Sequence, residues 1–511
     1  MTLAAMPTLR HVIDTHARLC PGAPFLIAPE TGITLTYADL ANVVRGLTAR
    51  LRGEGAVPGD VVSFMLGNGA AAATIFLGAM YGGYVVTPIN LLAQDAHLDH
   101  VLAHAAPKLV FCAADFAPRL AAAIARIGGH TQVLVVDPDA AEFGGVDAGP
   151  LAPLDAAAPT LLMYTSGTTG LPKGVLLTHA NLIHAGNAVA RGHALGPKDR
   201  VLSSLPLYHI NGQCIGTVSP LVSGGSVVMP RRFSASQWWT QVETYRPTWL
   251  NLVPTIVAYL LNGPGLSPMQ AQACRGVRFA RSASAPLPPE QHRAFEARFG
   301  IGILEALGLT ETASVAFANP MEPARRKIGS CGMPLGVAAR VVAADGSALP
   351  DGERGEVEIC GANVMAGYHR APEDTSKTLR DGRWLRTGDL GHRDADGFYF
   401  ITGRLKELII KGGENIAPRE IDEALLRHPA VLEGAAVGVP DAQYGQEILA
   451  CVVVKPGAAL DEAELRAHCE RELGRYKAPK YLRFVAELPK GPSGKVQRLR
   501  LAETAANIAN M

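Results

Sequence analysis

The sequence has almost no excess of charge of either sign and no closely paired cysteines. It carries 47 Lys and Arg against 46 Asp and Glu, which leaves a formal net charge of +1. That balance gives no basis for binding nucleic acid or a membrane surface. The eight cysteines are scattered and none forms a CxxC pair, so neither a zinc site of that type nor a thioredoxin-like motif is indicated. We expect free thiols, as in a cytosolic enzyme.

The N-terminal segment lacks the features of a secretory signal. Residues 1–5 include no basic residue, and Arg10, His11 and Asp14 interrupt the apolar character of the residues beyond them. We therefore expect no signal peptide and a cytoplasmic protein.

No charged residue occurs between Val61 and Gln94. A run of that length raises the question of a membrane-spanning helix. Glycine, proline and asparagine interrupt the run, so it divides better into a strand at 61–66, a helix at 70–80 and a strand at 84–86. We expect a buried βαβ unit and no insertion into a membrane.

The length of 511 residues is too great for a single core, so two or more domains are expected. Strands and helices alternate through the first half, as in a mostly parallel sheet. The predicted fold class is α/β. We expect a large N-terminal domain over residues 1–404, with a small β-rich subdomain at about 329–403, and a small α+β C-terminal domain over 405–511.

Further elements are expected from the same periodicities. Helices are expected at 1–19, 38–53, 118–127, 179–190, 418–427 and 461–472. Strands are expected at 24–27, 34–37, 109–112, 132–136, 160–163, 175–177, 201–204, 227–229, 249–253, 277–280, 339–343, 355–360, 397–402, 435–439, 448–454 and 481–484.

One stretch, YTSGTTGLPKGV from Tyr164 to Val175, packs hydroxyls, glycines and a lysine together. Glycines let the backbone wrap closely around a ligand, and hydroxyls, backbone N–H groups and a lysine suit phosphate oxygens. It is not a Walker A loop, because Lys173 is followed by Gly174 instead of Ser or Thr. A polar surface loop is the plain alternative. The expected nucleotide contacts are Thr165, Ser166, Gly167, Thr168, Thr169 and Lys173.

This stretch resembles the phosphate loop of the adenylate-forming superfamily, which includes acyl-CoA synthetases, luciferases and the adenylation domains of peptide synthetases. Further motifs of that family occur along essentially the whole chain in the family's order. The resemblance implies a large N-terminal domain with a small mobile C-terminal lid.

ALGLTET, from Ala306 to Thr312, resembles the family motif of an aromatic residue followed by Gly-x-Thr-Glu. The resemblance implies that Glu311 binds Mg²⁺ and that Thr310 contacts the α-phosphate. Ala306, Leu307 and Gly308 then line the adenine, with Leu307 standing where many relatives have a stacking Tyr. SASAPLP resembles the loop that lines the adenine and the acid, through Ser284 and Ala285.

The segment WLRTGDLG and the later TGR resemble the ribose-binding motifs of the family. Asp389, expected in a turn between strands, would accept the ribose hydroxyls, with Arg404 as its companion. Lys406 stands at the hinge position between the two domains.

Three C-terminal features resemble the family's lid. Gly412 and Gly413 lie in the loop that admits the pantetheine arm of coenzyme A. Arg475 and Lys477 are candidates for its phosphates. Lys495, in GPSGKVQR, matches the catalytic lysine, a cation placed where one anion attacks another.

The resemblance implies an acid–thiol ligase that uses ATP, Mg²⁺ and coenzyme A to convert a carboxylic acid first to acyl-AMP and then to a thioester. His209, in PLYHINGQ, would orient the acid or open the path for the thiol, unless it is a structural histidine. The stretches PLYHINGQ and FSASQWW look more like those of ligases for small or polar acids.

Several alternatives stay open at this point. The expected substrate is a small, polar or aromatic carboxylic acid, with medium- or long-chain fatty acids as alternative substrates. A stand-alone enzyme that adenylates amino or aryl acids is an alternative activity. The alternative from a different class is a non-catalytic nucleotide-binding protein. The expected partners are small molecules only, with a homodimer left open.

Overall fold

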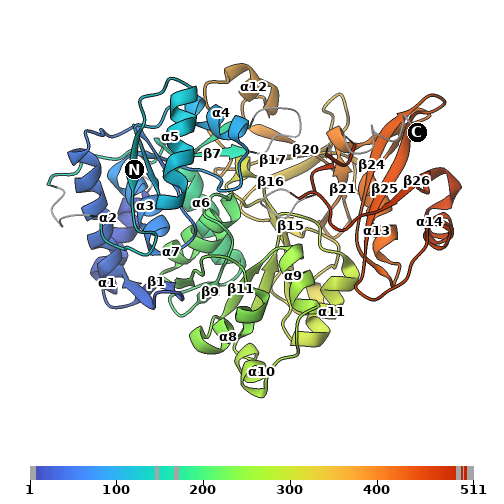
Figure 1. Ribbon diagram of the computed structural model, residues 1–511, viewed down its shortest axis with the longest axis horizontal. Coiled ribbons are helices and arrows are strands. Elements are labelled where there is room, and N and C mark those ends of the chain that lie inside the picture. Colours follow the sequence, from blue (N-terminus) through green and yellow to red (C-terminus); the bar gives the residue numbers. More distant parts are fainter. Residues whose placement is uncertain (1–6, 144–148, 166–171, 491–495, 499, 503–511) are drawn as a thin grey trace.

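The computed structural model describes residues 7–143, 149–165, 172–490, 496–498 and 500–502 (Figure 1). The strands of the described residues form four sheets. In Figure 1 the orange and red C-terminal part lies to the right of the blue, green and yellow remainder. None of the described helices is long and apolar enough to cross a membrane.

A seven-stranded sheet contains most of the strands from the first third of the chain. Its parallel core is the buried βαβ unit that the charge-free run predicts, because every residue of the intervening helix is buried. In spatial order its strands are β18 (Gly367–Tyr368), β8 (Lys173–Thr178), β7 (Pro159–Thr165), β4 (Val85–Pro88), β3 (Val61–Met65), β5 (Leu109–Cys112) and β6 (Gln132–Val135).

A second sheet has nine strands, and, as in the first sheet, the strands in its middle are parallel. In spatial order its strands are β15 (Met333–Pro334), β14 (Phe317–Ala318), β13 (Ile303–Leu307), β12 (Phe279–Ser282), β11 (Trp249–Leu252), β9 (Arg200–Leu202), β10 (Ser226–Val228), β1 (Pro24–Ala28) and β2 (Ile33–Thr36).

Two five-stranded, mainly antiparallel sheets come later in the chain. The first is the predicted β-rich region, formed by β16 (Ala338–Val342), β17 (Gly355–Cys360), β19 (Leu379–Arg380), β20 (Trp384–Arg393) and β21 (Tyr399–Arg404). The second belongs to the C-terminal part, formed by β22 (Ile409–Lys411), β23 (Glu414–Ile416), β24 (Val431–Asp441), β25 (Gly445–Val454) and β26 (Tyr481–Phe484).

Helices cover the faces of these sheets (Figure 1). Local sequence starts several of them: Thr36 and Thr178 each form a capping box at the N-terminus of the next helix. The α-helices are α1 (Leu9–Leu19), α2 (Tyr37–Gly53), α3 (Ala70–Gly82), α4 (Asp95–Ala105), α5 (Ala117–Arg126), α6 (His179–Gly192), α7 (Ser219–Ser223), α8 (Ala235–Tyr245), α9 (Pro254–Leu261), α10 (Pro268–Cys274), α11 (Pro289–Phe299), α12 (Pro372–Thr378), α13 (Pro418–Leu426) and α14 (Glu462–Lys477).

The structure differs from the elements expected from the sequence at three points. The region 206–213 continues into a π-helix, η2 (Asn211–Val218), for which no element is expected from the sequence. Asp389 does not lie in a turn, because β20 runs through it and pairs it with Arg404 of β21. Helix α4, which lies beside α5 in Figure 1, is absent from the elements expected from the sequence.

Candidate active site

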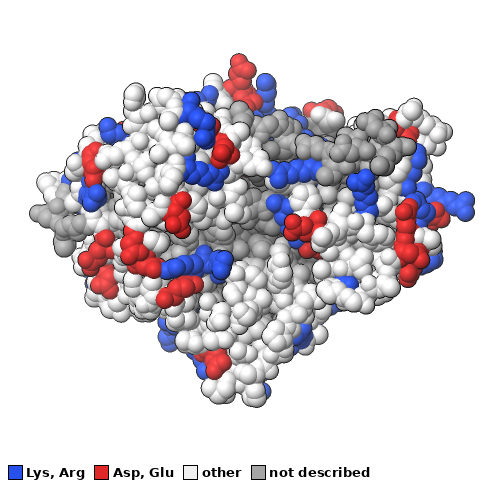
Figure 2. All heavy atoms as spheres, in the orientation of Figure 1, with Lys and Arg blue, Asp and Glu red and all other residues white. Residues whose placement is uncertain are grey.

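A large cleft, about 1890 Å³ in volume, opens between the N-terminal body and the C-terminal part. Most of its body wall follows the carboxyl ends of sheet strands, which is where doubly wound sheets bind ligands. Figure 2 shows the surface hollowed between these two parts, with Lys and Arg side chains at the edge of the hollow. Predicted site residues on the wall are Thr165, Lys173, His209, Ser284, Gly308, Thr310, Glu311, Arg404 and Lys406.

The predicted phosphate loop joins the antiparallel strands β7 and β8. Thr165 ends the first strand, and Lys173 begins the second. The Lys173 ammonium lies 2.8 Å from the Asp374 carboxylate and above the ring of Tyr368. This ion pair holds the lysine at the cleft and lowers the pKa of Asp374. Ser166, Gly167, Thr168 and Thr169 lie outside the described residues.

Glu311 is fixed by a residue that no sequence motif singles out. It lies in the short 3-10 helix η3 (Thr310–Thr312), next to Thr310. The Tyr368 hydroxyl donates a 2.9 Å hydrogen bond to Glu311 Oε1. Burial, followed by the Glu311 carboxylate, raises the pKa of Tyr368, which keeps this hydroxyl protonated. Tyr368 therefore ties the predicted metal ligand to the side of the phosphate loop.

Gly308 shows why the turn before Thr310 needs glycine. A Cβ at this position would lie 2.1 Å from the backbone of Ser314. Ala306 is buried in β13, and Leu307 ends that strand with its side chain half-buried. Ala306, Leu307 and Ala285 are not among the described residues that line the cleft.

The predicted ribose pair forms directly. Asp389 and Arg404 are partners across β20 and β21, and Arg404 Nε lies 2.8 Å from Asp389 Oδ1. The carboxylate is almost fully buried, with 3% of its side chain exposed, whereas the guanidinium borders the cleft. Asp389, more than any other group, raises the pKa of Arg404. The aspartate thus holds an arginine whose charge faces the cleft.

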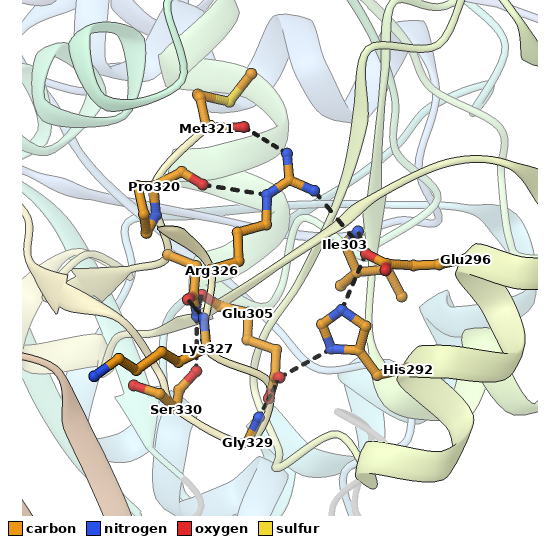
Figure 3. Close-up of polar contacts among 11 residues, drawn as sticks. His292, Glu296, Ile303, Glu305, Pro320, Met321, Arg326, Lys327, Gly329 and Ser330 are labelled. Carbon is orange, nitrogen blue, oxygen red and sulfur yellow. Dashed lines mark hydrogen bonds and ion pairs between the residues drawn. The ribbon is translucent and has the colours of Figure 1, made fainter. Parts of the chain in front are cut away.

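A buried histidine, His292, links the segment that follows the Ser284 loop to the strand that leads to Glu311 (Figure 3). His292, on α11, lies between two carboxylates, with Nδ1 3.0 Å from Glu305 and Nε2 3.2 Å from Glu296. A neutral imidazole could donate to only one of them. Helix α11 follows the Ser284 loop, and Glu305 lies on the strand that leads to Glu311. The brace therefore fixes two predicted ligand loops against each other.

The same cluster reaches the β-rich sheet. Glu305 accepts a 2.8 Å hydrogen bond from the backbone of Gly329, whose segment leads back to Lys327 (Figure 3). Lys327 Nζ lies 2.5 Å from Asp394 and 2.6 Å from Asp396, in the turn that joins β20 to β21. The strands that carry the predicted ribose pair are thereby anchored to β13, the strand that carries Glu305 and leads to Glu311.

The wall around His209 combines polar groups with aromatic and aliphatic side chains. The Asn211 amide donates a 3.2 Å hydrogen bond to the Ser284 hydroxyl, and both residues face the cleft. Ser284 has φ of +75°, a left-handed conformation that costs a non-glycine residue free energy and is common at functional sites. The other side chains of this wall include Tyr208, Phe233, Ile256 and Tyr259.

The C-terminal part contributes the opposite wall. Lys406 lies in η5 (Leu405–Glu407), between the last strand of the body and β22. Arg498 contacts Glu407 at 3.3 Å and also pairs with Asp422. Both Lys406 and Arg498 face the cleft. Lys495 lies outside the described residues.

The predicted coenzyme A residues lie away from the cleft wall as described. Gly412 and Gly413 form the tight turn between β22 and β23, with φ of +56° and +87°. Glycine is needed there because two consecutive positive φ values disfavour any side chain. Arg475 is exposed, with 92% of its side chain accessible, whereas Lys477 lies 2.8 Å from the carboxylate of Glu420.

The predicted Mg²⁺ site fits the chemistry of a nucleotide-bound ion. No group of three or more His, Cys, Asp or Glu side chains among the described residues could hold a metal by itself. Mg²⁺ bound with a nucleotide commonly takes only one or two carboxylates, with phosphate oxygens and water completing its shell. Glu311, at the cleft wall and oriented by Tyr368, meets that need.

The chain matches two models of known protein families. A family model described as AMP-binding enzyme matches residues 13–369, and one described as AMP-binding enzyme C-terminal domain matches residues 420–495.

Two curated relatives align with nearly the whole chain. A sulfoacetate–CoA ligase of Cupriavidus necator is 56% identical over 503 residues, covering 98% of each protein. An oxalate–CoA ligase of Arabidopsis thaliana is 33% identical over 512 residues, covering 97% of this chain and 98% of the relative.

Solved structures show the same fold. ATP-bound MatB from Rhodopseudomonas palustris has a TM-score of 0.88 at 32% identity, covering 97% of this chain and 99% of that one. The o-succinylbenzoate coenzyme A synthetase of Bacillus subtilis, in complex with ATP and magnesium, has a TM-score of 0.85 at 28% identity, covering 96% and 98%.

Proposed function

This chain belongs to the AMP-binding enzyme family, and from that premise we propose that it joins a short, doubly anionic acid to coenzyme A at the expense of ATP. It is an acid–thiol ligase that forms AMP and pyrophosphate. The observation that carries the proposal is the 56% identity to a sulfoacetate–CoA ligase along 98% of both chains. Sulfoacetate is therefore the first acid to test.

The domain organisation of the chain supports this function. We assign residues 1–404 to an adenylation domain, with 329–403 as its β-rich subdomain, and residues 405–511 to a mobile lid. Lys406 is the proposed hinge. The assignment is supported by the fourth sheet, which begins at Ile409, and by the two family models, which end and begin on either side of this point.

In the first half-reaction, the carboxylate of the acid attacks the α-phosphate of ATP, and pyrophosphate leaves. The 165–173 loop grips the β- and γ-phosphates, and Thr310 donates a hydrogen bond to the α-phosphate. Asp389 and Arg404 hold the ribose. Lys495 neutralises the charge that accumulates as one anion approaches another.

Glu311 would hold Mg²⁺, which supplies charge neutralisation at the phosphates when it is bound. Tyr368 keeps this carboxylate oriented toward the cleft through its 2.9 Å hydrogen bond.

In the second half-reaction, the thiol of coenzyme A attacks the acyl carbon and AMP leaves. Rotation of the lid about Lys406 exchanges Lys495 for the Gly412–Gly413 turn, which lets one cleft serve two reactions. Arg475 and Lys477 contact the phosphates of coenzyme A, which requires Lys477 to exchange Glu420 for phosphate. His209 lies beside the carboxylate that reacts.

Location and assembly remain predictions from the sequence. We place the enzyme in the cytoplasm. Homodimer formation is tested by light scattering on the purified protein across its working concentration range.

A panel of carboxylic acids tests the proposal directly. The purified enzyme is incubated with ATP, Mg²⁺ and coenzyme A, and AMP and the thioester are quantified for each acid. We expect equal amounts of both products, with the highest kcat/KM for sulfoacetate or another short acid with two negative charges. Absence of AMP with every acid would favour a non-catalytic nucleotide-binding protein instead.

A further inference from the structure

A guanidinium group is buried beneath the His209 wall, and no carboxylate of the described residues pairs with it. Arg281, on β12, is 1% exposed. Its Nε and Nη1 atoms have no hydrogen-bond partner within the part of the chain that the structure describes. Burying a charge without a partner is costly, so its presence calls for an explanation beyond stability.

The position of Arg281 is set by the register of the central sheet. It lies beside Asn251 of the neighbouring strand β11, and the chain after it leads directly to Ser284 at the cleft. Because side chains alternate along a strand, Arg281 shares the face of Phe279, which belongs to the main core.

A chain of hydrogen bonds connects this face with the cleft. The Asn251 amide donates to Ser203 Oγ at 3.2 Å and to Asn211 Oδ1 at 3.1 Å. The Asn211 amide in turn donates to Ser284 Oγ at 3.2 Å, and these last two residues face the cleft. The polar wall is therefore backed by a fixed amide, with the buried cation next to that amide on the sheet.

The charge beneath the wall is positive. Burial lowers the pKa of Arg281 to about 10, so the guanidinium stays charged at neutral pH. Burial, followed by the field of Arg281, lowers the pKa of His193 to about 3, so that ring stays neutral.

We propose that Arg281 selects acids that carry a second negative charge, such as a sulfonate, at the end remote from the reacting carboxylate. This inference rests on the proposed function and deepens it. Asn211 and Ser284 contact the remote anion, and Arg281 acts behind them as a positioning residue whose field stabilises it. Asn211 is held by Asn251, so its amide is already oriented when the acid arrives.

Selection by charge follows from this arrangement. The carboxylate that reacts with ATP is common to all substrates and cannot discriminate among them. A buried cation in a poorly polarisable interior interacts with a second anion more strongly than the same cation would in water. An uncharged tail of equal size gains nothing from it.

Two acids of nearly the same shape test the inference. Sulfoacetate carries a sulfonate, whereas methylsulfonylacetate replaces one charged oxygen by a methyl group and is neutral at that end. We expect the wild-type enzyme to favour sulfoacetate at least about tenfold in kcat/KM, with the difference in KM. Arg281→Met should remove that preference through KM for sulfoacetate, and Arg281→Lys should keep most of it.

Asn211→Asp provides a second variant that changes no buried arginine. A carboxylate at the wall opposes the remote anion, so this variant should also lose the preference for sulfoacetate. The matched control is Arg200→Met, which removes a half-buried arginine from the same sheet at a point where its guanidinium bonds Tyr245 and Ser226. That control should keep the wild-type preference.

The outcomes separate this inference from the proposed function. Equal loss of activity toward both acids in Arg281→Met, or a wild-type enzyme indifferent to the two, would overturn the role of Arg281 while leaving the ligase in place. If Arg281→Met does not fold, the comparison of the two acids in the wild type, Arg281→Lys and Asn211→Asp decides the question. Failure of every acid to yield AMP would instead remove the proposed function.

Discussion

The N-terminal body and the C-terminal part differ in how they hold their charged groups. In the body, two groups at the cleft are fixed by residues distant in sequence: Lys173 by Asp374, and Glu311 by Tyr368. In the C-terminal part, ion pairs such as the buried Lys411–Glu447 and the half-buried Arg498–Asp422 lock its own elements together. The body is built to position ligands, and the C-terminal part is built to stay intact as a unit.

The apolar cores show the same contrast. Within the described residues, the clusters of the C-terminal part contain only residues from Ile409 to Ala502, and the clusters of the body contain none of these. Contacts between the two parts include polar ones, such as the hydrogen bond from Arg419 to the carbonyl of Ile401. Parts with separate cores and a polar interface move readily relative to each other. This difference supports a fixed cleft with a mobile lid.

Replacement of Lys495 should have the largest effect. Lys495→Ala should lower acyl-AMP formation by roughly 100-fold or more, because the charge that builds up at the α-phosphate loses its cation. Conversion of supplied acyl-AMP to thioester should be unchanged. The two half-reactions are measured separately by pyrophosphate release and by thioester formation.

The control for Lys495 is Lys490→Ala, a cleft lysine paired at 2.6 Å with Glu433. It should keep the first half-reaction within a few-fold. Equal loss of both half-reactions in Lys495→Ala would contradict a lid that exchanges its groups.

Removing the charge of Asp389 should have the next largest effect. Asp389→Asn leaves Arg404 without its buried anion, so we expect KM for ATP to rise about 10- to 100-fold and stability to fall by about 2 kcal/mol. Steady-state kinetics and urea unfolding measure the two. Arg386 lies on the same strand as Asp389 and pairs at 3.0 Å with Glu356 of β17; Arg386→Gln breaks that pair and should leave KM for ATP unchanged.

Breaking the brace tests whether the body positions its ligands through buried contacts. His292→Ala leaves two carboxylates facing each other and should cost about 2–4 kcal/mol of stability, with a higher KM for ATP. Arg293→Ala, an exposed neighbour on α11, should change stability by less than about 0.5 kcal/mol. An unchanged KM for ATP in a folded His292→Ala enzyme would reduce the brace to a structural contact.

The loss of folding stability in acid should arise in the N-terminal body, and it should be small at neutral pH. The pKa of His193 is lowered to about 3 in the folded protein, so the unfolded chain binds more protons between that value and about 6.5. Stability should therefore be full above pH 6.5 and fall as the pH drops below it, by about 2 kcal/mol at pH 5 from this residue. His193→Gln should flatten the curve, and exposed His11→Gln should not.

Local pattern was enough to predict much of the fold. The charge-free run predicts the βαβ unit around α3, and β5, β17 and β26 have the bounds expected from the sequence. Helix α4 is not among the expected elements, although its buried residues, Leu98, Val101, Leu102 and Ala105, have helical spacing. The π-helix η2 is different, because Gly212 and Gly216 disfavour a helix in isolation. Close packing requires glycine in this π-helix, because a Cβ on Gly212 would lie 2.4 Å from the carbonyl of Pro206.

The site was only partly predictable for a related reason. Resemblance to a family identified several side chains that face the cleft, such as Lys173 and Glu311, and it named Asp389 and Arg404 together, which form an ion pair. It did not identify Tyr368, Asp374 or His292, because these act by holding other residues. Such partners come from distant segments that only the register of the folded sheets brings together.

Acid-dependent exchange of labelled pyrophosphate into ATP, measured without coenzyme A, tests the central claim most directly. A fixed cleft that completes acyl-AMP formation before the lid turns should catalyse this exchange with sulfoacetate or another short, doubly anionic acid, and coenzyme A should not be required. An enzyme that forms thioester but shows no exchange until coenzyme A is added would contradict two separate half-reactions in one cleft.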